Sequence, residues 1–300
     1  MGRILSQYPT LGYIHEPLNR NIAKSYPGMF SVDVPTWYLY VTEENEGAYI
    51  EAFRRLMDFR YDIGAAVRRL GLADQTSTDY SDAEQSMLRE YVRFLNCRLS
   101  HAIPLIKDPF AVMSLPWLVR RFGARPVVMI RHPAAFVASV RRQGGGFRLK
   151  NVLEQPLLMR DHPIPPYAGY TVTEIDQLDN HDVRKIAFGW RYIYSVVARY
   201  RAKNPVWLFV KHEDLARDPV NGFLQMFQTL GLRWSTEIER RIKAEAVEWR
   251  TSNPAATGVN NSATGNKLQG WKQHLSAAEI GHVRAISEDV ASLFYNDDDW

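Results

Sequence analysis

Four short apolar runs, each ending in charged residues, limit the folds open to this chain of 300 residues. Runs of four or five apolar residues that are rich in Val and Ile are typical of strands buried on both faces of a parallel sheet. Longer segments with apolar residues at helical spacing lie between the runs. Strands that alternate with helices predict an α/β fold with a parallel sheet. The runs are residues 12–15, 102–107, 126–131 and 206–211.

The predicted helices cover residues 49–57, 87–95, 186–200 and 280–294, where apolar side chains share one face. Two segments break the alternation. Residues 143–183 contain three consecutive glycines and four prolines, and residues 251–270 are rich in Asn, Ser, Thr, Ala and Gly. Both are predicted to be loops. Long loops on an α/β scaffold are either disordered or functional, often as lids, and the sequence leaves both alternatives open.

Charge and cysteine content exclude some classes of protein. The formal net charge of +4 is mild and spread along the chain, so nucleic-acid binding is not predicted, although the balance suits an enzyme that handles an anionic ligand. The single cysteine, Cys97, excludes an intramolecular disulfide and a multi-cysteine zinc site, and the histidines lack ligand spacing, so no metal is predicted. No apolar run approaches the ~18–20 residues of a membrane span. We expect a soluble, cytoplasmic protein.

The turn after the third run carries the strongest local signal. The strand ends at Ile130, and Pro133 stands at the preferred first position of a following helix. Free backbone N–H groups at such a helix start favour an anion. The Arg131 guanidinium group suits phosphate, and Ser139 can add a hydroxyl donor. The turn is therefore a candidate phosphate site; the alternative is an ordinary strand–helix turn with a surface arginine.

An apolar strand, then Arg, then Pro two residues on and Ser eight residues after the Arg resembles the 3′-phosphate motif of PAPS-dependent sulfotransferases. PAPS, 3′-phosphoadenosine-5′-phosphosulfate, is the sulfuryl donor of this family. The resemblance implies that Arg131 and Ser139 hold the 3′-phosphate of the nucleotide. It also implies a three-layer sandwich like that of P-loop kinases, with a central parallel sheet flanked by helices.

Further segments resemble the family in the same order along the chain. Residues 12–19, Gly-Tyr-Ile-His-Glu-Pro-Leu-Asn, are similar to the Glu-Pro segment of carbohydrate-type members, and residues 105–109 resemble the end of the third strand. Residues 210–219 resemble a strand followed by Tyr-Glu-Asp-Leu, with His212 in place of Tyr, and residues 271–276 resemble a Trp-Lys segment. A hydroxyl group of a carbohydrate or glycolipid is the acceptor that this resemblance implies.

Glu16 is the candidate catalytic base. Sulfuryl transfer requires a group that takes the proton of the acceptor hydroxyl within hydrogen-bond reach, and a carboxylate at a strand end can do so. Some family members use a glutamate in a comparable position. Neutral His15 is the alternative base, and the structural alternative is that Glu16 caps a turn or pairs with an Arg. For Lys107 and Asp108, a ligand contact and a structural ion pair both stay open.

Two further segments are interpreted with the help of the resemblance and of helix electrostatics. Residues 257–270 correspond to a family loop that closes over the nucleotide, and Lys267, the one cation in that segment, is the candidate nucleotide contact. Glu213 and Asp214 are predicted to begin a helix, whose N-terminus favours negative charge, so their predicted role is structural.

The family's phosphosulfate loop, which resembles Gly-x-Pro-Arg-Ser-Gly-Thr and follows the first central strand, has no counterpart in the sequence. Residues 2–9 resemble the back end of the helix that follows this loop. We therefore expect that the first strand is missing through a misplaced start site, and that the working product is ~20–35 residues longer. A remnant or an inactive paralogue is the alternative.

The combined prediction is one sulfotransferase-like domain over residues 1–300 that transfers a sulfuryl group from PAPS, its co-substrate, to an acceptor hydroxyl. Two alternatives stay open. One is a non-catalytic nucleotide- or glycan-binding protein. The other is a P-loop kinase-like phosphotransferase, which needs a Walker lysine; the glycines at 144–146 are not followed by the Lys-Ser or Lys-Thr of such a loop.

Overall fold

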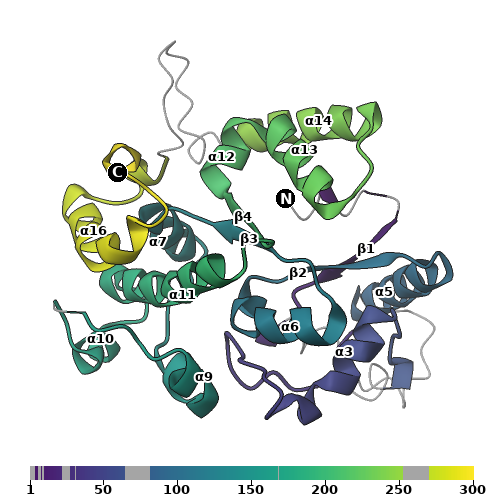
Figure 1. The fold of residues 1–300 in the computed structure, drawn as a ribbon, viewed down its shortest axis with the longest axis horizontal. Helices are drawn as coiled ribbons and strands as arrows, with labels where there is room; N and C mark the ends of the chain where they lie inside the picture. The colour runs from purple at the N-terminus through teal and green to yellow at the C-terminus, as the bar shows by residue number, and fades with distance from the viewer. Residues whose placement is uncertain are drawn as a thin grey trace. The chain divides into compact units, whose positions relative to one another are not determined.

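The computed structural model describes residues 4, 5, 8, 10–21, 28–30, 32–64, 82–167, 169–252 and 270–300, which form an α/β structure (Figure 1). The chain divides into two compact units, Met1–Phe122 and Gly123–Trp300. Each unit contains a two-stranded parallel sheet, with helices between its two strands and after the second strand in the sequence. The α/β class and the parallel strand direction are therefore confirmed.

The first unit contains strands β1 (Leu11–His15) and β2 (Ile103–Lys107), which pair in parallel from Leu11 opposite Ile103 to His15 opposite Lys107. Its core is aromatic: Phe53 meets Trp117 edge to face, with ring centroids 5.1 Å apart. Both rings are fully buried, and such pairs add to the stabilisation that burial itself gives. Its helices are η1 (Glu46–Ala48), α3 (Ile50–Met57), α5 (Asp82–Leu99), η3 (Pro109–Ser114) and α6 (Leu115–Phe122).

The second unit contains strands β3 (Val127–Ile130) and β4 (Leu208–Lys211), which pair in parallel from Val127 opposite Leu208 to Ile130 opposite Lys211. Helix α7 (Pro133–Arg142) follows β3, and α12 (His212–Arg217) follows β4 without a linker. The other helices are α8 (Lys150–Leu153), α9 (Pro156–Asp161), α10 (Val172–Gln177), α11 (Val183–Lys203), α13 (Pro219–Leu230), α14 (Thr236–Ser252), η4 (Gly270–Gln273), α16 (Ala277–Ala291) and η5 (Asp297–Asp299).

Helices α7, α11 and α16 pack against one another and form the core of the second unit (Figure 1). Helix α11 is buried on almost all sides, and it also fixes the end of β3. Trp190 Nε1 donates a hydrogen bond to the Arg131 carbonyl oxygen at 2.9 Å, and the Arg131 N–H donates to the Tyr194 hydroxyl at 3.1 Å. The backbone of Arg131 is thus held on both sides by one rigid helix.

Two buried cations fasten the segment 143–183 to this helical core. The Arg191 side chain, 3% exposed, pairs with Asp289 at 2.5 Å and donates hydrogen bonds to the carbonyl oxygens of Pro165 and Pro166. Lys185 Nζ donates to the carbonyl oxygens of residues Asp176 and Leu178. Because buried charges are costly unless they are paired, these contacts hold the segment in place.

The predicted strands and helices occur where the apolar patterns indicated, but the loop prediction for residues 143–183 is wrong. This segment contains α8, α9 and α10. Pro156 stands at the first position of α9, and Thr171 and Glu174 form a capping box at the start of α10. The proline therefore begins a helix, as proline at a first helical position can.

Sheet pairing and helix exposure also differ from expectation. The four described strands form two separate pairs, where one central sheet was expected, and each strand bonds a single described neighbour. Helix α5 exists as predicted, but its apolar stripe is exposed at Leu88, Val92, Leu95 and Leu99. Within the described ranges, no helix is long and apolar enough to cross a membrane.

Candidate functional site

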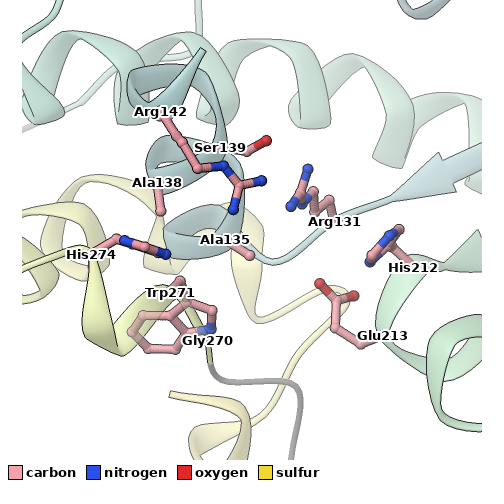
Figure 2. Close-up of a pocket in the computed structure, with 10 residues that line it drawn as sticks. All are labelled: Arg131, Ala135, Ala138, Ser139, Arg142, His212, Glu213, Gly270, Trp271 and His274. Atoms are coloured by element: carbon pink, nitrogen blue, oxygen red, sulfur yellow. The ribbon is translucent and has the colours of Figure 1, made fainter. Parts of the chain in front are cut away.

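A small pocket opens in the second unit where the turn from β3 into α7 faces the starts of α12 and η4 (Figure 2). Its volume is about 30 Å³, which exceeds the roughly 10–15 Å³ that one water molecule requires in a cavity. The lining combines two arginines, a serine, two histidines and a glutamate with small and aromatic residues. It consists of Arg131, Ala135, Ala138, Ser139, Arg142, His212, Glu213, Gly270, Trp271 and His274.

Arg131 comes directly after β3 and places its guanidinium group in this pocket. Its Nε atom is buried and has no hydrogen-bond partner among the described residues. Burial lowers the pKa of Arg131, while the nearby Glu213 carboxylate opposes that shift. A buried guanidinium donor without an acceptor is costly, and an anion in the pocket would supply the acceptor.

Ser139 lies in α7 with its hydroxyl group in the same pocket, and it is only 7% exposed to solvent. Ser139 Oγ accepts a hydrogen bond of 3.0 Å from Gln143 Nε2. Helical serines commonly donate their proton to a backbone carbonyl, as Ser287 does to Val283 in α16 at 2.7 Å. Among the described residues, the Ser139 proton has no such acceptor, so it can be donated to a ligand.

The glycines at 144–146 end α7, the helix that contributes Ser139 and Arg142 to the pocket. Gly144 has a left-handed φ of +65°, its N–H donates to the Arg141 carbonyl oxygen, and the Gly145 N–H donates to that of Val140. This pair of bonds is a Schellman motif, which requires a residue in the left-handed region just beyond the helix. The motif sets the position of the last helical turn, and with it Arg142 and Gln143.

Arg142 contributes a second guanidinium group to the pocket. Figure 2 shows the guanidinium groups of Arg142 and Arg131 directed toward a common space, with the Ser139 hydroxyl group beside them. Among the described residues, the Arg142 side chain has no hydrogen bond or ion pair. Its positive charge lowers the pKa of Arg131. Two like charges that share a pocket repel each other, and an anion placed between them would relieve this repulsion.

Glu213 lies on the opposite side of the pocket at the start of α12, the place predicted for it. Its Oε1 accepts from the His132 backbone N–H at 3.0 Å, and its Oε2 accepts from the Tyr295 hydroxyl at 2.9 Å. Burial raises the pKa of Glu213, and the hydrogen bonds and Arg131 limit that rise. The carboxylate thus ties the β3–α7 turn to the C-terminal residues.

His132 stands at the N-cap position of α7, yet its side chain makes no capping hydrogen bond. The imidazole is 2% exposed and packs against Trp271, Tyr295 and Trp300, with ring centroids 4.5–5.1 Å away. Both ring nitrogens lack a hydrogen-bond partner in the described part of the chain. Burial lowers the pKa of His132 to about 3, so the ring is neutral near pH 7.

Glu16, the candidate base, belongs to the first unit and lies at the carboxyl end of β1. Its Oε1 pairs with Lys107 Nζ, and its Oε2 accepts a hydrogen bond from Asn19 Nδ2 at 2.7 Å. Burial raises the pKa of Glu16, but the bonds from Lys107 and Asn19 outweigh burial and bring that pKa below its ordinary value. Glu16 is therefore ionised near pH 7, with both oxygens engaged.

Asp108, at the end of β2, is held by backbone groups. Its Oδ2 accepts from the Leu18 N–H at 2.6 Å, and its Oδ1 accepts from the Phe110 N–H at 2.8 Å. Burial raises the pKa of Asp108 to about 7, although both backbone hydrogen bonds lower it. Lys107 pairs with Glu16, so the structural ion pair considered for Lys107 and Asp108 involves Glu16 instead.

The structure brings Arg131 and Ser139 together in one pocket, as their predicted shared role requires. Sequence reasoning missed Arg142, Gln143, His274 and Trp271 as neighbours of these residues. The Gly-Gly-Gly sequence could have indicated the helix end that positions Arg142 and Gln143. Lys267 lies outside the described residues.

This arrangement can bind a small oxyanion without a metal ion. Two guanidinium groups and a hydroxyl proton are donors of the kind that phosphate oxygens accept. The orphaned Arg131 Nε fits a bound phosphate group, since that group would supply its missing acceptor. Compared with family models, curated proteins and solved structures, the chain shows no significant match to any of them.

Proposed function

We propose that this protein is a PAPS-dependent sulfotransferase, whose pocket beside β3 and α7 holds the 3′-phosphate of the nucleotide. The observation that carries the proposal is the pairing of Arg131 and Ser139. A buried guanidinium donor without an acceptor and an uncommitted hydroxyl proton meet in one pocket, as the sequence motif requires. Arg142 adds a second positive charge. Lys267, which the sequence resemblance assigns to the nucleotide, is a further candidate contact.

PAPS would supply the sulfuryl group, and the residues of this chain would bind the donor and remove a proton from the acceptor. Arg131 and Ser139 would anchor the nucleotide through charge-assisted hydrogen bonds. Glu16, ionised near pH 7, would take the proton of the acceptor hydroxyl. For this role Glu16 must exchange one of its two present hydrogen bonds for one to the acceptor.

The finer parts of the proposal rest on the sequence resemblance. They are a three-layer arrangement like that of P-loop kinases, a carbohydrate or glycolipid hydroxyl as acceptor, and a cytoplasmic location, where the lone Cys97 would stay reduced. The segments 143–183 and 251–270 would frame the acceptor and the nucleotide. No metal takes part in the proposed reaction.

A non-catalytic nucleotide-binding protein is the second candidate, and one observation favours it. Both oxygens of the proposed base are engaged, by Lys107 and Asn19, so Glu16 has the contacts of a structural residue. In that case the protein would bind adenosine 3′,5′-bisphosphate without transferring sulfate from PAPS.

Calorimetry with three nucleotides tests the proposal. Adenosine 3′,5′-bisphosphate should bind at least tenfold more tightly than adenosine 5′-phosphate, which lacks the 3′-phosphate, and than ATP. Arg131→Ala should weaken the bisphosphate by about 10–100-fold, the range for a lost hydrogen bond to a charged group, with Arg131→Lys between. Transfer of radiolabelled sulfate from PAPS to a panel of glycans separates the two candidates. Equal affinity for all three nucleotides would overturn the proposal.

A further inference from the structure

The pocket contains a contact that the sulfotransferase motif does not describe, between Ser139 and Gln143. Gln143 Nε2 and Ser139 Oγ are 3.0 Å apart, one helical turn from each other at the end of α7. The amide donates, so the hydroxyl oxygen is already an acceptor. A hydroxyl group has one proton to donate, and here that proton is left for another partner.

We propose that Gln143 is a positioning residue: it occupies the acceptor side of the Ser139 hydroxyl group and thereby directs the Ser139 proton toward an oxyanion bound by Arg131. This proposal rests on the proposed function, in that it takes the bound group to be a nucleotide phosphate. Without Gln143, the Ser139 hydroxyl group could turn its proton to the backbone carbonyl one turn back, as Ser287 does.

The helix end holds Gln143 in the position that this role requires. Its backbone N–H donates to the Ser139 and Val140 carbonyl oxygens at 3.3 and 3.2 Å. The two bonds that follow, from Gly144 and Gly145, lock the turn beyond it. The backbone from which the Gln143 side chain reaches Ser139 is therefore fixed.

Arg131, Arg142 and the Ser139 hydroxyl group then form a side of the pocket that offers donors. The Glu213 carboxylate lies on the opposite side, where His132 and Tyr295 already bond both of its oxygens. A phosphate oxygen accepts hydrogen bonds and has no proton to offer when fully ionised, so it repels an oriented acceptor. Gln143→Glu would invert the arrangement, because an ionised carboxylate can only accept and would draw the Ser139 proton to itself. Gln143→Leu would remove the amide without adding charge.

The test is a double-mutant cycle on the full chain, with two probes, adenosine 3′,5′-bisphosphate and inorganic phosphate. Affinities would be measured by calorimetry and by ligand-dependent shifts in melting temperature. Gln143→Leu should weaken both probes about three- to tenfold in the Ser139 background and less than twofold in the Ser139→Ala background. Gln143→Glu should weaken them more, with a part that persists in Ser139→Ala because of charge repulsion alone.

The outcomes separate this inference from the proposed function. Binding of the bisphosphate with equal effects of Gln143→Leu in both backgrounds would overturn the positioning role and leave the function standing. Coupling between positions 139 and 143 for phosphate, without preference for the bisphosphate, would leave the positioning role and overturn the function. Binding of neither probe by the unchanged protein would overturn both. Melting temperatures without ligand show whether each variant is folded.

Discussion

The imidazole of His132 stacks on the indole of Trp271, with ring centroids 5.1 Å apart and planes inclined by 13°. The contact links the turn that follows β3 to the η4 segment, and both of them line the pocket. It also explains why this histidine does not cap α7: its ring packs among aromatic side chains instead of turning toward the helix N-terminus.

Acid should destabilise the second unit through His132. Its pKa is about 3 in the folded protein against an ordinary value of 6.5, so the unfolded chain takes up this proton first as the pH falls. The contribution of His132 to the free energy of unfolding is constant above pH 6.5. Between pH 6.5 and about 3 it decreases by about 1.4 kcal/mol per pH unit. Burial lowers the pKa of His212 to about 4, so it adds in the same direction.

Urea unfolding between pH 7.5 and 4.5 measures this effect. His132→Phe keeps an aromatic ring in the cluster and should flatten the pH profile by close to one proton. The exposed His282 of the same unit provides the control, His282→Asn, whose profile should follow the unchanged protein. Parallel profiles for His132→Phe and the unchanged protein would show that His132 does not carry the acid sensitivity.

Arg142→Ala should weaken adenosine 3′,5′-bisphosphate binding, because it removes one of the two guanidinium groups that face the pocket. We expect a loss of about three- to tenfold at low salt, smaller than for Arg131 because Arg142 is exposed and screened by solvent. Calorimetry at low and at high ionic strength checks this.

Arg141 provides a matched control for that substitution. It has the same charge, in the same helical turn, but it pairs with Glu279 at 2.6 Å and does not line the pocket. Arg141→Ala should change the affinity less than twofold. Similar losses for both variants would mean that only the general positive charge of α7 matters.

Gly144→Ala should destabilise the protein by roughly 1–2 kcal/mol, the cost of a left-handed backbone for an L-residue. Nothing lies within 4 Å of the added methyl group, so the cost comes from the backbone alone. Gly281→Ala, inside α16 and equally free of neighbours, should instead stabilise by roughly 0.5–1 kcal/mol. Denaturation midpoints measure both, and a neutral Gly144→Ala would contradict the Schellman assignment.

Glu16→Gln should reduce sulfuryl transfer about 10²- to 10⁴-fold while adenosine 3′,5′-bisphosphate still binds, because an amide cannot take the acceptor proton. Glu46→Gln is the control in the same unit. Glu46 accepts hydrogen bonds from Trp117 and Arg121 and has no part in the proposed reaction. Transfer rates with saturating PAPS distinguish the variants. Full activity of Glu16→Gln would leave Glu16 as no more than the partner of Lys107.

Local signals in the sequence predicted the parts of the fold that depend on neighbouring residues. The four strands lie in the apolar runs, and α7 begins at Pro133. Arg131 and Ser139 meet because the strand end and the following helix are contiguous, so one turn places both. These features need no knowledge of distant contacts.

Contacts between distant residues could not be predicted in the same way. Glu16 meets Lys107 because β1 and β2 pair with His15 opposite Lys107, and this register depends on side-chain packing across the pair. The aromatic neighbours of His132 come from residues more than 130 positions later in the chain. Neither arrangement has a local pattern that would reveal it.

The ties from Arg191 to Pro165 and Pro166, and to Asp289, change how the segment 143–183 can act. A mobile loop that closes over a ligand must become ordered in each binding event, and the entropy lost in that ordering reduces the affinity for the ligand. The backbone at Pro165 and Pro166 has already lost its freedom during folding. A ligand that contacts this part of the segment would meet a preformed surface. Recognition there would depend on how well the ligand fits that surface, and association would not require a preceding conformational change.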